Sequence, residues 1–207
     1  NFSPNEVWKY YFYCGRINAI NLNIQEAHDY LLKAYKTCPH RLRENRRLIL
    51  VYLIPIEFFY GKLPTTKNGL IEYYELDIFT KFANSIVLGR IRAFDRSLKE
   101  HQFTFFRLGI YQLVSLARKL VYYQILKCAY IQFGSNKMPV QVFHEALLIK
   151  DDDDEEDDDG EYQYTIDEAE SIVSMLIEMK LIQAYIHHGL HYIVFGKDPF
   201  KPLSVYD

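Results

Sequence analysis

Three histidines near the C-terminal end are the side chains whose type and spacing come nearest to metal chemistry. His187, His188 and His191 lie within five residues of one another, and neutral imidazole is a common zinc ligand. A zinc protease, however, carries two histidines one turn apart on a helix, with a glutamate between them as the base. These histidines fall at the tip of a predicted hairpin, so the sequence predicts no metal site.

Nine consecutive carboxylates at residues 151–159 form a second group that could bind a cation. A calcium loop needs glycine at its sixth position and glutamate at its twelfth. Counting from Asp151 places Glu156 and Tyr162 there, so we predict instead a solvated acidic loop inserted at residues 150–161. The chain also lacks the GxxxxGKS/T, GxGxxG and GxSxG motifs, and we predict no catalytic residue, no cofactor and no enzymatic activity.

Two arginine clusters carry binding chemistry, because a guanidinium can grip a carboxylate or a phosphate with two donors at once. We predict that both clusters bind an acidic partner. The alternative is a solvated face with internal ion pairs, for example to Glu44 or Asp95. One of Arg46 and Arg47 is expected to be structural, because the apolar residues 48–53 follow directly. The first cluster is Arg41, Arg43, Arg46 and Arg47, and the second is Arg90, Arg92 and Arg96.

Charge is divided unevenly along the chain. Residues 1–149 carry 20 Lys and Arg against 11 Asp and Glu, whereas residues 150–207 carry 4 against 16. A basic body attracts an anionic partner, and by charge alone this could be a nucleic acid or an acidic polypeptide.

Cysteine content and hydropathy bear on the compartment. The three cysteines, Cys14, Cys38 and Cys128, are far apart, which argues against a disulfide framework and favours buried thiols in a reducing compartment. No apolar run of about 18 residues and no signal-peptide pattern occurs, so we expect a soluble intracellular protein. The chain begins at Asn1 rather than at methionine, and we expect an upstream segment in the complete protein.

Residues 5–133 follow a helical pattern, with apolar and aromatic side chains at three- and four-residue spacing and breaks at Gly, Pro and Asn. Pairs of helices at this spacing are typical of a tetratricopeptide-like repeat array, and we assign residues 1–115 to it. We expect a first helix that begins near Val7 and a second that runs from Ile24 to Cys38. Further helices are expected at residues 42–60, 73–88, 91–101 and 103–133, and the last of these is expected to break near Gly109.

The period of the pattern changes after Gly134. A short strand is expected at residues 136–138, helices at 140–148 and 165–180, and a hairpin from 181–186 and 190–195. With residues 116–133 as the first helix, this is the element order of a winged helix, which we assign to residues 116–207. The predicted fold class is therefore mainly α, a tetratricopeptide-like array followed by a C-terminal winged helix.

Winged helices often insert their third helix into the DNA major groove. Here that helix, residues 165–180, carries four carboxylates and one lysine, so it would repel phosphates and we reject DNA reading through it. Contacts to nucleic acid are predicted instead from basic side chains of the wing and its surroundings. These are Lys137, His187, His188, Lys197 and Lys201.

A central block of sequence, residues 45–50, 52–55 and 61–64, reads NRRLIL, YLIP and GKLP. It closely resembles PCI-domain proteins of the signalosome-subunit-twelve-like group. Further pieces of the resemblance are YFYCGR at residues 11–16 and DPFKPL at 198–203, so it covers nearly the whole chain. The long acidic insertion is similar to the fungal subunit-twelve paralogue, a relative of the PCI subunit of the nuclear transcription-and-export complex.

The resemblance implies two protein partners, a second PCI-domain protein of the Sac/Thp family and a small acidic protein of the Dss/Sem family. It implies a nuclear scaffold, also found in the cytoplasm, that acts in transcription, splicing or mRNA export. RNA or DNA would bind to a surface of the assembled complex, and no membrane is involved. The second PCI protein would pair through the wing, at Ile182, Tyr185, Tyr192 and Phe195. Alternatives are a self-sufficient RNA- or DNA-binding protein and a subunit of a signalosome-like or proteasome-lid-like assembly.

Overall fold

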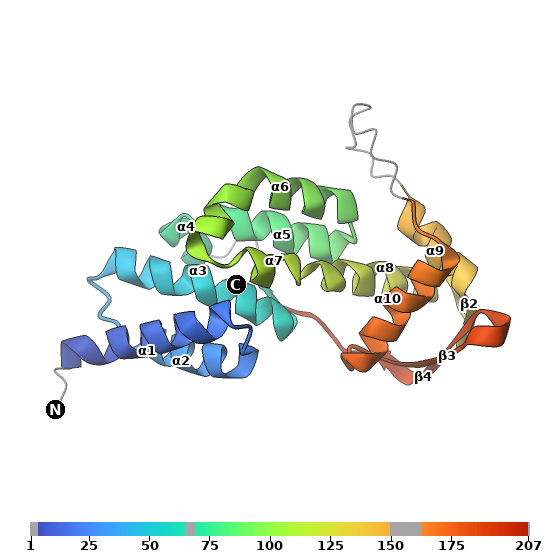
Figure 1. Cartoon of the computed structure of the whole chain (residues 1–207), viewed down its shortest axis with the longest axis horizontal. Helices are drawn as coiled ribbons and strands as arrows, with labels where there is room; N and C mark the ends of the chain where they lie inside the picture. Colours follow the sequence, from blue (N-terminus) through green and yellow to red (C-terminus); the bar gives the residue numbers. More distant parts are fainter. Residues whose placement is uncertain (1–3, 65–68, 150–162, 207) are drawn as a thin grey trace. The chain divides into compact units, whose positions relative to one another are not determined.

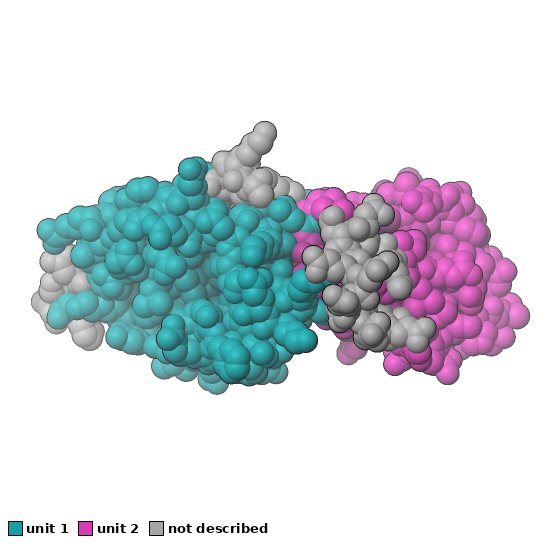
Figure 2. All heavy atoms as spheres, turned by 90° about the horizontal axis from the view of Figure 1, so that it is seen from above, with its two compact units in different colours: residues 1–84, 94–117, 203–207 teal, residues 85–93, 118–202 magenta. Residues whose placement is uncertain are grey.

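The computed structural model describes residues 4–64, 69–149 and 163–206. The predicted acidic loop at residues 150–161 lies outside the described residues. The chain divides into two compact units, shown in teal and magenta in Figure 2. Unit 1 comprises Asn1–Asn84, Phe94–Ala117 and Leu203–Asp207, and unit 2 comprises Ser85–Ala93 and Arg118–Pro202.

Unit 1 opens with a pair of helices, α1 (Pro4–Ile20) and α2 (Ile24–Thr37), that lie side by side (Figure 1). Their approach is close because Gly15 faces Leu31: a Cβ added to Gly15 would lie 2.6 Å from Leu31 Cγ. The small residues Ala27 and Ala34 are fully buried on the same helix as Leu31. Small side chains at the contact therefore set the packing of this first repeat.

The third helix, α3 (Arg43–Phe59), supplies most of the core of unit 1 and keeps Pro55 in its interior. Its Tyr52 hydroxyl donates a hydrogen bond to the Leu108 carbonyl at 2.8 Å, which ties it to the end of a later helix. The remaining elements that contribute to unit 1 are β1 (Lys62–Pro64), α4 (Gly69–Tyr74), α5 (Asp77–Leu88), α6 (Ile91–Leu108), α7 (Tyr111–Ser115) and β5 (Ser204–Tyr206).

Three of the predicted helix boundaries are wrong, and one is in the stretch after Gly109, which is divided into α7 (Tyr111–Ser115) and α8 (Arg118–Phe133) instead of being one helix. The single helix expected at residues 73–88 is two helices, because Glu75 adopts a left-handed φ of 54° and ends α4. The helix expected to stop at His101 continues as α6 to Leu108, where Gly109, with φ 73°, ends it as predicted. A two-stranded parallel sheet was not predicted: β1 pairs with β5, with Lys62 opposite Ser204.

Unit 2 contains a winged helix. Helix α8 (Arg118–Phe133) leads into β2 (Lys137–Pro139), α9 (Val140–Leu148) and α10 (Ile166–Glu178). The wing follows as β3 (Ile182–His187), a 3-10 turn (His188–Leu190) and β4 (Tyr192–Phe200), in an antiparallel sheet of order β2-β4-β3.

The start of α10 is set by the predicted capping box. The Thr165 hydroxyl accepts a hydrogen bond from the Glu168 backbone N–H, and the Glu168 carboxylate accepts one from the Thr165 N–H at 2.7 Å. These two bonds satisfy donors that a helix otherwise leaves unpaired.

The predicted fold class, a helical-repeat array followed by a winged helix, is confirmed. Within the described ranges, no helix is both long and apolar enough to cross a membrane. The cysteine prediction is wrong in part, because Cys38 is buried and Cys14 half-buried, whereas Cys128 is exposed.

Candidate functional site

The first arginine cluster lies at the N-terminal end of α3, and Arg46 is a correction to its predicted role. Its Nη1 donates to the carbonyls of Cys38 at 2.8 Å and Tyr35 at 3.0 Å, and its Nε donates to the Tyr74 hydroxyl at 2.9 Å. The guanidinium also lies 4.0 Å from the centre of the Tyr35 ring. Arg46 is buried, so it joins elements of unit 1 and offers no charge to an acidic partner.

Two further arginines of this cluster are held by the end of α4. Arg43 Nη2 donates to Glu75 Oε1 at 2.9 Å, and this hydrogen bond is the main cause that raises the pKa of Arg43. Arg47 Nε donates to the Tyr74 carbonyl at 2.9 Å. The structure therefore favours internal pairing for both, whereas Arg41 is exposed and its role in binding an acidic partner stays a prediction.

The second arginine cluster is divided between the units. Arg90 and Arg92 belong to unit 2 and Arg96 to unit 1. All three take part in interactions within the chain. Arg96 is exposed and the other two are half-buried. Because the three residues belong to different units, they do not form one binding face of a single unit.

The wing residues predicted to bind a second PCI protein fall on two faces of the sheet. Side chains alternate between the faces of a strand, and Ile182 and Phe195 are buried on the inner one. The Phe195 ring lies 4.6 Å from that of Tyr130 on α8. Both inner residues are therefore corrections, because they form the core of unit 2. Tyr185 is 61% exposed and Tyr192 is partly exposed.

Two of the three histidines share one carboxylate. His188 Nδ1 lies 3.0 Å from Glu170 Oε2, and His191 Nδ1 lies 2.8 Å from Glu170 Oε1. Hydrogen bonding from His188 is the main cause that lowers the pKa of Glu170. This cluster joins the tip of the wing to α10. In the part of the chain that the structure describes, no group of three His, Cys, Asp or Glu side chains could hold a metal ion.

The residues predicted to contact nucleic acid are exposed but spread along the wing. Lys137 lies at one edge of the sheet, with its ammonium 4.8 Å from the centre of the Tyr192 ring. His187 pairs with Tyr192 at one end of β4, and Lys201 follows the other end. Nine strand residues cover about 27 Å, so these side chains do not form one compact site. His188, with Lys197, completes this set on the surface of unit 2.

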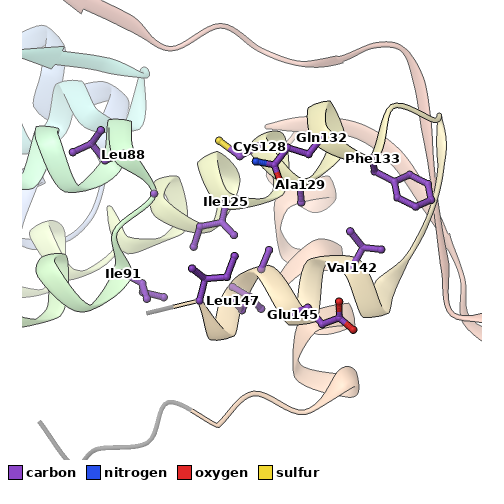
Figure 3. Close-up of a pocket in the computed structure, with 13 residues that line it drawn as sticks. Leu88, Ile91, Ile125, Cys128, Ala129, Gln132, Phe133, Val142, Glu145 and Leu147 are labelled. Carbon is purple, nitrogen blue, oxygen red and sulfur yellow. The ribbon is translucent and has the colours of Figure 1, made fainter. Parts of the chain in front are cut away.

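A groove between α8 and α9 was missed by the sequence interpretation. Its volume is about 510 Å³, and it lies wholly within unit 2. Ile125 on α8 and Leu147 on α9 point toward one another in it (Figure 3). Leu88, Phe133 and Ile149 line it and are exposed, and Glu145 is the one charged side chain among the lining residues. An apolar, exposed groove of this kind is typical of a protein-binding surface.

Two sequence signals could have indicated the groove. Helix α8 has apolar residues on all sides, which means that more than one of its faces is covered by protein. The exposed pair Leu148 and Ile149 also lies one residue before the acidic run, where a solvated loop would favour polar residues.

Paired helices followed by a winged helix, with apolar surface left exposed, define a helical-repeat scaffold. The comparisons with known proteins agree with this class. A family described as PSMD3-like, N-terminal TPR repeats matches residues 1–68. The PCI domain-containing protein 2 homolog of Drosophila melanogaster is 31% identical, over 99% of this chain and 49% of the fly protein. The homolog of Dictyostelium discoideum is also 31% identical, over 99% and 45%.

A PCI domain-containing protein of Schizosaccharomyces pombe is 28% identical over 97% of this chain and 45% of its own length. The chain belongs to the PCI-domain proteins and is related to PCI domain-containing protein 2. It spans about half the length of the curated relatives it matches.

Proposed function

We propose that this PCI-domain protein is a non-catalytic scaffold subunit of a nuclear complex that acts in transcription, splicing or mRNA export. In the complex it pairs with a second PCI-domain protein of the Sac/Thp family and with a small acidic protein of the Dss/Sem family. The assembly presents a surface to RNA or DNA. Membership of the PCI-domain proteins supports the scaffold role, and the resemblance of the central sequence block to the signalosome-subunit-twelve-like group supports the choice of partners.

The observation that carries the pairing proposal is the open edge of the wing sheet. Strand β3 pairs with β4 on one side, and no described strand pairs with its other side. An edge strand presents backbone N–H and C=O groups that a strand of another chain can pair with. Tyr185 projects from this strand and is 61% exposed, and aromatic side chains of this kind often contribute most to binding. The pairing surface is thus Tyr185 and the β3 edge, without Ile182 and Phe195.

Charge supports the other two partners. Arg41 and Arg96 are exposed and remain candidates for the acidic protein, through contacts that salt would weaken. Lys137, Lys197 and Lys201 are exposed in unit 2. Since they are spread along the wing, each contributes one weak phosphate contact, and we expect stable RNA binding from the complex rather than from this chain alone.

The test is a titration of the second PCI subunit against the protein and two variants. Tyr185→Glu introduces a charge at the edge strand and should raise the Kd at least about tenfold. Ile131→Glu is the control, because Ile131 is 63% exposed on α8 and lies outside the wing, and it should leave this Kd unchanged. Pairing that survives Tyr185→Glu, or that both variants weaken equally, would overturn the proposal.

A further inference from the structure

Helix α1 carries apolar side chains on two faces, and only one of them is buried. Trp8, Phe12 and Ala19 are buried in unit 1. On another face the large side chains are between 45% and 59% exposed. They recur at intervals of three, four and three residues, which is the spacing of a seam between two packed helices. These residues, named here the α1 seam, are Tyr10, Tyr13, Ile17 and Ile20.

Two hollows lie beside the α1 seam, one at Tyr13 and one at Ile20. The first hollow, of about 150 Å³, is lined by Tyr13 together with Trp8 and Leu48. The second hollow, of about 410 Å³, is lined by Ile20 together with Phe106 and Tyr111, whose rings are stacked with centres 4.2 Å apart. Tyr13 and Ile20 are two helical turns apart, about 11 Å along the axis. The seam and the hollows therefore form one apolar surface within unit 1.

Basic side chains outnumber acidic ones around the two hollows, and the exposed Glu44 beside the first is paired with Arg43 at 3.2 Å. Neither hollow is lined by a carboxylate. Lys9 lines the first hollow and is exposed, and the exposed Arg107 follows Phe106 beside the second. Glu6 is the one carboxylate of α1 and lies at its N-terminal end. A partner with acidic residues beside its apolar ones would gain from these charges, and a basic partner would be repelled.

We propose that the α1 seam is a docking site for an acidic amphipathic helix of a partner protein. The partner helix places apolar side chains, spaced three and four residues apart, against the seam. It inserts a large side chain into each hollow and directs carboxylates toward Lys9 and Arg107. A helix of about three turns covers the seam. This inference goes beyond the proposed function, because it uses a surface on unit 1 that the pairing of winged helices through β3 does not require.

The experiment measures binding of two synthetic helical peptides of about three heptads, with leucine at both seam positions. One peptide carries glutamate at the flanking positions and its twin carries lysine. We expect the acidic peptide to bind at least about tenfold more tightly than its twin, with an affinity that falls as salt is raised. Ile17→Glu should weaken the acidic peptide at least about tenfold. Ile131→Glu is the matched control, at an isoleucine 63% exposed in unit 2, and should not.

Several results would overturn the proposal. These are equal affinity for the two peptides, no binding of either, or equal effects of Ile17→Glu and Ile131→Glu while both variants keep the melting temperature. A monomer–dimer equilibrium abolished by Ile17→Glu would make the occupant a second copy. If peptide binding is lost in a longer polypeptide that contains this chain, the occupant of the seam is a segment of the same protein. Tyr185→Glu should leave peptide binding intact, so failure of this proposal is separable from failure of wing pairing.

Discussion

Glu170 holds the tip of the wing to α10 through both carboxylate oxygens, which His188 and His191 contact. Hydrogen bonding from His188 is the largest cause that lowers the pKa of this carboxyl below its ordinary 4.5. A carboxyl whose pKa is lower in the folded state stabilises the fold above its unfolded pKa. That stabilisation is lost as the pH falls through the folded pKa. We therefore predict that Glu170 contributes to a loss of stability below about pH 4.5.

The measurement is the free energy of unfolding by denaturant at several pH values between about 3 and 7. Glu170→Gln should lower stability at neutral pH and make its decline below pH 4.5 shallower. Glu178→Gln changes an exposed carboxylate on the same helix and serves as the control. If Glu170→Gln and the control have the same pH profile, the contact does not stabilise the wing.

Single residues also show where sequence reasoning stops. The position of Arg46 beside an apolar run indicated that it or Arg47 was structural, but its acceptors belong to Tyr35, Cys38 and Tyr74, in other parts of unit 1. The three histidines were correctly placed at the hairpin tip. Their partner Glu170 lies 18 and 21 residues earlier than the two histidines, and no local pattern indicates such a pair.

At the scale of secondary structure, the contact between α1 and α2 predicts that replacing a helical glycine with alanine lowers the stability of the protein, which is the opposite of the usual effect. Alanine in a helix interior is normally about 1 kcal/mol more favourable than glycine. At Gly15 the added methyl would lie 2.6 Å from Leu31 Cγ and 3.0 Å from the Leu31 backbone nitrogen. Crowding of a packed core typically costs about 1–3 kcal/mol. Gly15→Ala should therefore lower the melting temperature.

Gly69→Ala is the control for this substitution. A Cβ at Gly69, the first residue of α4, would meet no atom within 4 Å, so alanine should be neutral or slightly stabilising there. Thermal unfolding followed by circular dichroism compares the two variants. An unchanged or higher melting temperature for Gly15→Ala would mean that α2 can shift without loss.

Elements with strong local signals were predicted well. Helix α9 has the predicted bounds, because Pro139 starts it, and α10 begins at the predicted capping box. The break at Glu75 was missed because glutamate in a left-handed conformation gives no sequence signal of the kind that glycine or proline gives. The groove between α8 and α9 depends on packing within unit 2. In the sequence it is indicated only by the apolar residues on all sides of α8 and by the apolar pair Leu148 and Ile149.

At the scale of the whole molecule, the acidic run should act on electrostatics rather than on the fold. Deleting residues 151–161 removes ten negative charges. The capping box of α10 and all of α9 lie outside the deleted segment, so the midpoint of thermal unfolding should stay the same. Binding of a single-stranded RNA oligonucleotide at low salt should rise, because repulsion of the phosphates is reduced.

Replacing residues 151–159 with asparagine is the matched variant, since it removes charge and keeps the length of the connection. Both variants should bind the RNA more tightly, and the gain should shrink as salt is raised. A large drop in melting temperature in the deletion alone would indicate that the length of the segment matters to the fold. Unchanged RNA affinity at low salt in both variants would mean that the acidic run does not reduce RNA binding by repelling phosphates.

The pairing of β1 with β5 has a consequence for how the protein is made. Lys62 of β1 leaves the ribosome early, whereas its partner Ser204 emerges only after every residue of unit 2. Helix pairs such as α1 and α2 depend on neighbours in sequence and can form quickly, but pairing over so long a loop is slow. Strand β1 therefore has no partner strand until the whole of unit 2 has been synthesised. Unit 1 therefore cannot be completed before unit 2 has been synthesised, although α1 of unit 1 precedes all of unit 2 in the sequence.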